Sequence, residues 1–197
     1  MSENNDLGRI TTFALELDRL KTVLRKTRPS GLDRLENSAE HSWQVCLLAL
    51  LLADHSPAPL DRLRLVELLL VHDIAEIDAG DRIVYQAADA DALLAEQQAA
   101  QRIFGMLPEA QAETCLARWL EYEARTSSEA RFAYAVDRLM PVLHNLHNGG
   151  QSWRENRVPL ARILSVNKVI DEVLPALWDE LLPKIEQMAE RCGLPTE

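Results

Sequence analysis

The sequence predicts an all-α protein, built as one bundle of about seven or eight helices over residues 1–197. Apolar residues recur every three or four positions along most of the chain, which is the spacing of one face of a helix. No stretch of strand length alternates apolar with polar residues. Leucine and alanine, both good helix formers, dominate the composition, whereas glycine occurs only 7 times.

Three helices are predicted in the N-terminal half of the chain. Apolar residues at helical spacing indicate the first over about 10–28, and a Pro-Ser-Gly sequence at 29–31 ends it. The second, over about 38–52, is apolar on all sides, which is typical of a buried helix. The third covers about 60–77, is apolar along most of its length and closes at Gly80.

The C-terminal half supplies the remaining helices. Two are predicted over about 88–106 and 108–123, and the second begins at a proline, which suits the first turn of a helix. A long helix follows over about 128–147, and residues 158–189 form one or two helices that break at Pro175. Because the chain contains no repeat, low-complexity tract or linker, it is predicted to fold as a single domain.

The charge and cysteine content exclude several classes of function. The chain carries 21 Lys and Arg residues against 31 Asp and Glu residues, a net charge of −10, whereas a nucleic-acid interface requires an excess of cations. Three widely spaced cysteines without a C-x-x-C pair favour a reducing compartment. The N-terminus lacks an apolar signal core, and no apolar run approaches the length of a membrane span. We therefore expect a cytoplasmic protein that binds neither nucleic-acid polymers nor membranes.

Positive charge is concentrated in one segment of this acidic chain. From Arg19 to Arg34, six basic residues accompany a single acidic residue, Asp33. The segment is either a solvated helix face with its loop, or a set of cations that faces an anionic ligand such as a small phosphorylated molecule.

Residues 71–76 are the most informative segment of the chain. They place His72, Asp73 and Glu76 in or beside a strongly apolar run. Burying an unpaired carboxylate is costly, so these groups need a compensating cation. Two interpretations remain open, a divalent metal ion and a buried ion pair without metal. Imidazole and carboxylate together suit Mn, Fe, Co or Zn, and suit Mg less well.

Any further metal ligand must come from another helix. His41 lies at the start of the second predicted helix, where it is either a ligand or simply a polar residue of the first turn. Asp137 lies in the middle of the long helix among apolar neighbours, where it is either a ligand or the partner of Arg138 or Arg131 in a buried salt bridge. Aspartate is a poor residue for a helix interior, which favours a specific role for Asp137.

Together these segments give the order His, His-Asp, Asp on separate helices, and this order resembles the HD-domain metal-dependent phosphohydrolase superfamily. Within that superfamily the chain is similar to the small 5′-deoxynucleotidase-like HD proteins, and the match is densest over 34–42, 71–81 and 131–138. The resemblance implies an HD domain with its metal-binding core over about 34–147 and C-terminal helices over about 158–191. It also implies a homodimer.

The resemblance further implies a role for each candidate site residue. One divalent ion (Mn, Co, Fe or Zn) would be held by four ligands: His41, His72, Asp73 and Asp137. Glu76 matches the family's general acid/base, Asp81 a second carboxylate near the nucleophilic water and the leaving group, and Arg34 a basic residue beside the bound phosphate. No histidine lies between residues 73 and 137, so the extra ligands of binuclear relatives are missing and a mononuclear site is expected.

The implied reaction is hydrolysis of a nucleoside 5′-monophosphate to a nucleoside and phosphate. A nucleotide phosphodiesterase or pyrophosphohydrolase is an alternative, because the same metal core serves those reactions in the superfamily. A non-catalytic, metal-binding helical signalling module is a second alternative, against which the presence of Glu76 and Asp81 speaks. The family's Arg-Trp-Pro stretch, which bears on sugar selection, reads Arg-Lys-Thr at 25–27 here, so neither the base nor the sugar is predicted.

Overall fold

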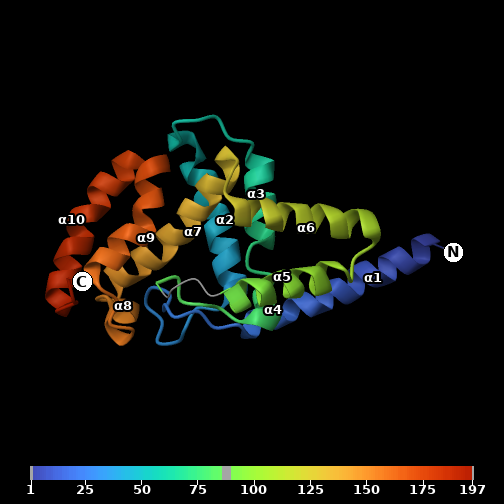
Figure 1. The fold of residues 1–197 in the computed structure, drawn as a ribbon, viewed down its shortest axis with the longest axis horizontal. Coiled ribbons are helices and arrows are strands. Elements are labelled where there is room, and N and C mark those ends of the chain that lie inside the picture. Colours follow the sequence, from blue (N-terminus) through green and yellow to red (C-terminus); the bar gives the residue numbers. More distant parts are fainter. Residues whose placement is uncertain (1, 86–89, 197) are drawn as a thin grey trace.

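Helix α7 (Ser128–His147) lies at the centre of the fold. The structure is a computed structural model that describes residues 2–85 and 90–196 of the chain (Figure 1). Four helices from both sides of α7 in the sequence pack against it: α2 (Ser38–Leu52), α3 (Arg62–Val71), α6 (Glu109–Ala124) and α9 (Leu160–Val173). Residues that are distant in the chain therefore meet on one helix.

The first predicted helix is wrong in its C-terminal part. Helix α1 (Ser2–Glu16) passes into a 3-10 helix, η1 (Leu17–Thr22), and Val23 is extended with φ −78° and ψ 114°. The segment that follows pairs with residues just before α2, since the Arg25 amide donates to the Glu36 carbonyl at 2.8 Å. This long-range pairing replaces the last two turns that the sequence predicts as helix.

Helix α2 begins where the sequence predicts, because its N-terminus is well capped. The Asn37 side chain accepts a hydrogen bond from the Glu40 amide at 3.0 Å, and the Glu40 carboxylate accepts one from the Asn37 amide at 2.8 Å. This capping box satisfies two backbone donors that have no partner within the helix, and such a cap stabilises a helix by about 1 kcal/mol. His41 is thereby fixed in the first turn, on the buried face of the helix. The prediction that this helix is buried on all sides is wrong, because Trp43, Leu47 and Leu51 on another face are exposed.

The third predicted helix is interrupted at the His-Asp pair. Helix α3 begins after the Asp61 cap and ends at Val71, and a separate short helix, α4 (Glu76–Ala79), follows. The intervening residues form tight turns, in which the Ile74 amide donates to the Val71 carbonyl at 3.2 Å. Because bonds of this kind span three residues, the chain is wound more tightly than an α-helix. His72 and Asp73 thus lie on a turn between two helices.

The C-terminal helices confirm the prediction closely. Helix α5 (Ala90–Phe104) matches the helix predicted over 88–106, of which residues 88 and 89 lie outside the described residues. Helices α6, α7 and α9 also lie where they are predicted, and α10 (Pro175–Cys192) starts at the predicted break. A short helix, α8 (Gln151–Glu155), was not predicted, and it follows Gly149 and Gly150, both with positive φ.

The all-α fold class is confirmed. Within the part of the chain that the structure describes, β-type pairing is limited to an isolated antiparallel bridge between Leu24 and Asn37. None of the helices in the described ranges is both long enough and apolar enough to cross a membrane.

Two apolar clusters stabilise the fold and meet at the His-Asp turn. The larger cluster packs α2, α3, α7, α9 and α10 together, and it includes Leu65, Leu68 and Leu69 of α3, none of them exposed. The smaller cluster joins η1, α4, α5 and α6, and it includes Val71 and Ile74. Burying a leucine side chain contributes about 1.5–3 kcal/mol, so the two clusters hold the backbone on both sides of the turn.

Candidate metal centre

The four predicted metal ligands meet at one buried point of the structure. His41 comes from α2, His72 and Asp73 from the turn after α3, and Asp137 from the middle of α7. One potential ligand atom from each of the first three residues lies within 4.8 Å of the others. The Oδ1 atom of Asp137 lies 2.9 Å from His41 Nε2 and 3.8 Å from His72 Nε2.

The His72 ring is oriented by the backbone of its own turn. Its Nδ1 atom lies 2.8 Å from the Leu69 carbonyl oxygen, which requires a proton on Nδ1. A metal ion would therefore bind Nε2 and displace the proton that this nitrogen carries when the ring is charged. Nε2 is buried, has no hydrogen-bond partner among the described residues and lies 3.1 Å from Asp73 Oδ1. Although burial opposes a charge on the ring, Asp73 and Asp137 raise the pKa of His72 to about 9. A buried nitrogen that faces two carboxylates is a good position for a cation.

The two oxygens of Asp137 have different partners. Oδ2 accepts hydrogen bonds from the Tyr122 hydroxyl at 2.8 Å and from Arg138 Nη2 at 2.5 Å. Oδ1 instead faces the imidazoles of His41 and His72. The salt bridge to Arg138 and a ligand position therefore do not compete, because each uses its own oxygen. Tyr122 was not identified from the sequence, since its contact with Asp137 joins two different helices.

His41 is backed by a carboxylate that the sequence did not single out. Glu36 is fully buried, and its Oε2 atom lies 3.4 Å from Nδ1 of His41 and 3.7 Å from Nδ1 of His144. The Thr27 hydroxyl also donates to Oε2 at 3.3 Å. Glu36 precedes the α2 cap in an irregular segment, where no periodicity distinguishes it from a solvated acidic residue.

The predicted phosphate-binding residue, Arg34, does not lie at this site. Its guanidinium forms a bidentate ion pair with the Glu40 carboxylate, in which Nη2 and Oε2 are 2.8 Å apart. Of the Arg34 side chain, 54% is exposed. Charge-assisted bonds to Glu40 hold it on the surface at the start of α2. The role of Arg34 beside the phosphate, which the resemblance implies, therefore stays a prediction, and it would require the ion pair with Glu40 to open.

Arg25 occupies the place that was expected for Arg34. Its side chain is buried, and Nη1 lies 3.0 Å from Asp73 Oδ2 and 3.6 Å from Asp81 Oδ1. The backbone pairing of Arg25 with Glu36 carries this side chain into the core. Two signals in the sequence pointed to Arg25: the basic cluster from 19 to 34, and the family's Arg-Trp-Pro stretch, whose arginine is Arg25 here. Neither signal was interpreted as a binding role for Arg25.

Both predicted catalytic carboxylates lie beside the same point. Glu76 lines a cavity of about 200 Å³ together with His72, Asp73 and Asp137, and its Oε2 atom accepts a hydrogen bond from the Ser38 hydroxyl at 2.6 Å. Burial and the Asp73 carboxylate raise the pKa of Glu76 well above its ordinary value. Burial likewise raises the pKa of Asp81, although Arg25 opposes that shift.

The donors and the charges at this point fit a divalent cation. In the part of the chain that the structure describes, five carboxylates surround two guanidinium groups, those of Arg25 and Arg138; the acids are Glu36, Asp73, Glu76, Asp81 and Asp137. An excess of buried negative charge is costly unless a cation compensates it. Two imidazole nitrogens with two carboxylate oxygens are a donor set of the kind that Mn, Fe, Co and Zn bind.

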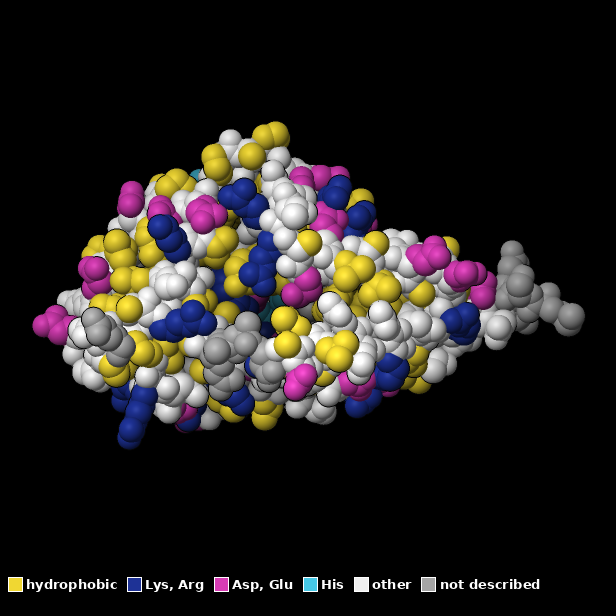
Figure 2. Space-filling model, in the orientation of Figure 1, with side chains coloured by type: hydrophobic (Ala, Val, Ile, Leu, Met, Phe, Trp, Pro, Cys, Tyr) yellow, Lys and Arg dark blue, Asp and Glu magenta, His cyan; other side chains and the backbone are white. Residues whose placement is uncertain are grey.

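The site opens into a larger cleft. The metal-site cavity shares five lining residues with a neighbouring cavity of about 590 Å³: Val84, Leu93, Glu96, Arg125 and Tyr134. Figure 2 shows the hollow near the middle of one face, with basic side chains along its rim. A cavity of this size falls in the range of about 300–1,000 Å³ that is usual for small-molecule sites.

Known proteins are similar to this chain in sequence and in fold. Residues 17–178 match the HD domain family. The chain is 30% identical to human 5′-deoxynucleotidase HDDC2 over 140 residues, and the match covers 66% of this chain and 65% of the human protein. It is 27% identical to the 5′-deoxynucleotidase hdd1 of Schizosaccharomyces pombe over 135 residues, which covers 66% of this chain and 67% of that protein.

A solved structure agrees over nearly the whole chain. The crystal structure of a predicted metal-dependent phosphohydrolase from Magnetospirillum magnetotacticum superposes with a TM-score of 0.88 at 38% sequence identity. The superposition covers 96% of this chain and 98% of that one. These matches confirm the resemblance found in the sequence, and the chain belongs to the HD domain family.

Proposed function

We propose that this protein is a metal-dependent phosphohydrolase that converts nucleoside 5′-monophosphates to nucleosides and phosphate. The observation that carries the proposal is the meeting of His41, His72 and Asp73 beside Glu76, whose carboxylate is not needed to complete the set of ligands. The nucleotide substrate is supported by the similarity to the human and fission-yeast 5′-deoxynucleotidases. A purely structural ion would need no spare carboxylates beside it.

The proposed ligands of a single divalent ion are His41, His72, Asp73 and Asp137. The His72 nitrogen without a hydrogen-bond partner and the Asp137 oxygen that Tyr122 and Arg138 leave free support this assignment. We propose Mn, Co, Fe or Zn rather than Mg, because two of the ligands are imidazoles. When bound, such an ion polarises a phosphoryl group and lowers the pKa of water.

The proposed role of Arg25 is to bind the phosphate of the substrate. Its guanidinium lies among Asp73, Asp81 and Glu76, at distances of 3.0, 3.6 and 3.8 Å. A planar guanidinium binds phosphate oxygens in pairs, and in this buried position its charge is weakly screened. Arg25 would thus offset the repulsion between the phosphate and the surrounding carboxylates.

Glu76 is the proposed general base, with Asp81 beside the leaving 5′-oxygen. The Ser38 hydroxyl fixes one oxygen of Glu76, and the other lies 3.8 Å from Arg25 Nη1, next to the proposed phosphate position. Because burial raises the pKa of Glu76, its carboxylate is a better proton acceptor than an exposed one. Asp81, whose pKa burial also raises, would donate a proton to the departing oxygen.

A homodimer in the cytoplasm is the proposed setting. Cys46, Cys115 and Cys192 are all free, which suits a reducing compartment. The dimer rests on the resemblance and on an exposed apolar stripe of α2, formed by Trp43, Leu47 and Leu51.

The proposal is tested by phosphate release from chelator-stripped protein to which Mn, Co, Fe, Zn or Mg is returned singly. The substrate panel contains ribo- and deoxyribonucleoside monophosphates, a nucleotide phosphodiester and a nucleoside triphosphate. We expect release from the monophosphates that depends on the added metal and disappears in the Glu76→Gln protein. Cleavage of the diester or the triphosphate in preference to the monophosphates would contradict the proposed substrate class.

A further inference from the structure

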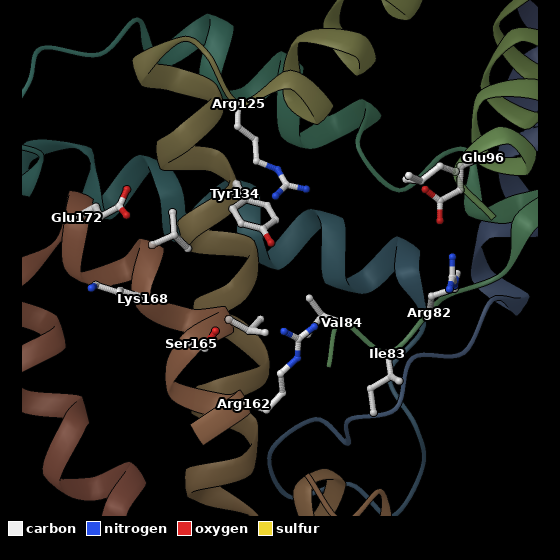
Figure 3. Close-up of a pocket in the computed structure, with 13 residues that line it drawn as sticks. Arg82, Ile83, Val84, Glu96, Arg125, Tyr134, Arg162, Ser165, Lys168 and Glu172 are labelled. Atoms are coloured by element: carbon white, nitrogen blue, oxygen red, sulfur yellow. The ribbon is translucent and has the colours of Figure 1, made fainter. Parts of the chain in front are cut away.

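The cleft beyond the metal centre contains an arginine whose guanidinium lies over the ring of a tyrosine. Tyr134 lies one helical turn before Asp137 on α7, so any group attached to a phosphate at the metal centre passes close to it. The guanidinium carbon of Arg125 lies 3.8 Å from the centre of the Tyr134 ring. Figure 3 shows Arg125 above Tyr134 and extending into the cavity.

The Arg125 side chain has little else to hold it there. Within the described residues its guanidinium forms no hydrogen bond or salt bridge; it lies over Tyr134 and is attracted to the nearby Glu123 carboxylate. Tyr134 is supported from behind by Tyr122, with the ring centres 6.3 Å apart and the planes at 66°. One face of the guanidinium therefore rests on a fixed ring, and the other is open to the cavity.

The backbone of Arg125 is also unusual. The residue ends α6 in the left-handed conformation, with φ 52° and ψ 31°. Glycine adopts this conformation without strain and is the usual residue at such a helix end. An arginine at this position is therefore kept at some cost in backbone strain.

We propose that the Arg125 guanidinium, held on Tyr134, is the surface on which the nucleobase of the substrate stacks. The inference rests on the proposed function and adds a binding residue for the part of the substrate beyond the phosphate. Bases stack on the plane of an arginine guanidinium, and stacking tolerates every base. Arg82, Arg162 and Lys168 also line the larger cavity, so the test must separate stacking on Arg125 from attraction to its charge.

The chain offers a matched control for a test of Arg125. Arg157, just after α8, also has a positive φ, of 49°, and it does not line either cavity. Arg125→Gly and Arg157→Gly thus remove the same side chain from the same backbone conformation, and any change in thermal stability from the backbone is common to both. Arg125→Lys keeps the charge of Arg125 but removes its plane.

Binding is measured by calorimetry in the metal-loaded Glu76→Gln background, so that no turnover interferes. The two ligands are a 2′-deoxynucleoside 5′-monophosphate and 2-deoxyribose 5-phosphate, which lacks the base. We expect Arg125→Gly to weaken binding of the nucleotide by about 5- to 100-fold and to leave the base-free ligand within about twofold. Arg125→Lys should lose most of the same affinity, and Arg157→Gly should lose none.

Three outcomes would overturn the inference. Equal weakening of both ligands by Arg125→Gly would place Arg125 at the phosphate or the sugar. Full retention of binding in Arg125→Lys would mean that charge, and not stacking, is used. Unchanged nucleotide binding in Arg125→Gly would mean that Arg125 does not contact the substrate. Failure of the wild-type protein to release phosphate from any nucleotide would instead overturn the proposed function, since the binding comparison does not depend on turnover.

Discussion

The Oε2 atom of Glu36 lies 3.4 Å from the Nδ1 atom of His41, and neither side chain is exposed to solvent. The opposite nitrogen of the same ring, Nε2, lies 2.9 Å from Asp137 Oδ1. The imidazole is therefore held between a supporting carboxylate and the proposed metal position. Although burial opposes it, the neighbouring His41 lowers the pKa of Glu36, which keeps the carboxylate charged.

Glu36→Gln is expected to weaken metal binding. Carboxylates behind a ligating histidine fix its orientation and increase its basicity, and their loss typically costs about 10- to 100-fold in metal affinity or activity. The affinity is measured by competition with a coloured chelator and, for Co, by visible absorption. Glu40→Gln is the control, because Glu40 caps the same helix but pairs with Arg34 on the surface. Equal affinities in both variants would show that Glu36 does not support His41.

One divalent ion per chain is expected after reconstitution. The described residues between 73 and 137 offer no further histidine, and the four proposed ligands converge on one point. Ligand binding to the folded state alone stabilises it by about 2.7 kcal/mol at 100 times Kd, which is about 5–10 °C in Tm for a chain of this size. Elemental analysis and a thermal scan with and without chelator measure both quantities. Two equivalents of metal per chain, or a Tm that is the same with and without the metal, would refute the assignment.

Glu76→Gln is expected to retain the metal and to lose most of the activity. Its carboxylate lies beside the proposed ligands and is held by Ser38, so its loss removes a proton acceptor and not a ligand. General acid–base catalysis contributes about 10²–10⁴-fold to the rate, and kcat should fall by that factor. Metal content is determined on the same preparation. Loss of the ion together with the activity would make Glu76 a ligand.

Arg25→Gln is expected to reduce kcat/KM by about 10- to 150-fold, which corresponds to about 1.5–3 kcal/mol from one charge-assisted hydrogen bond. We expect this loss because the Arg25 guanidinium is buried beside Asp73 and Asp81, at the proposed phosphate position. Arg34→Gln should change kcat/KM by less than about twofold, since a surface ion pair with Glu40 contributes little. A larger effect at Arg34 would restore the interpretation that the sequence suggested.

The proposed homodimer is expected to form through α2. Trp43, Leu47 and Leu51 recur every four residues along one face of this helix, and 67%, 46% and 64% of their surfaces are exposed. Contiguous apolar surface of this kind usually marks an interface. Leu51→Glu should convert the dimer to a monomer in sedimentation, whereas Leu120→Glu, an exposed leucine on α6, should not. A dimer that survives Leu51→Glu would exclude this face.

The sequence by itself determined the fold class, most helix positions and the chemistry of the site. Helix α7 was predicted over 128–147 and runs from Ser128 to His147, because spacing and caps are encoded by residues close together in the chain. The same is true of the His-Asp pair, since two ionisable residues in an apolar run require a compensating partner wherever the helix lies. The identity of the partner helices came from the resemblance to a family, and not from spacing.

Only the tertiary structure decided which side chains complete the site. Helix α1 is followed by η1 and an extended segment, because the Arg25 amide donates a hydrogen bond to the Glu36 carbonyl, eleven positions along the chain. That pairing brings Arg25 and Glu36 to the metal ligands and leaves Arg34 on the surface. Contacts of this kind depend on how whole helices pack, and no local pattern of hydrophobicity or charge carries that information.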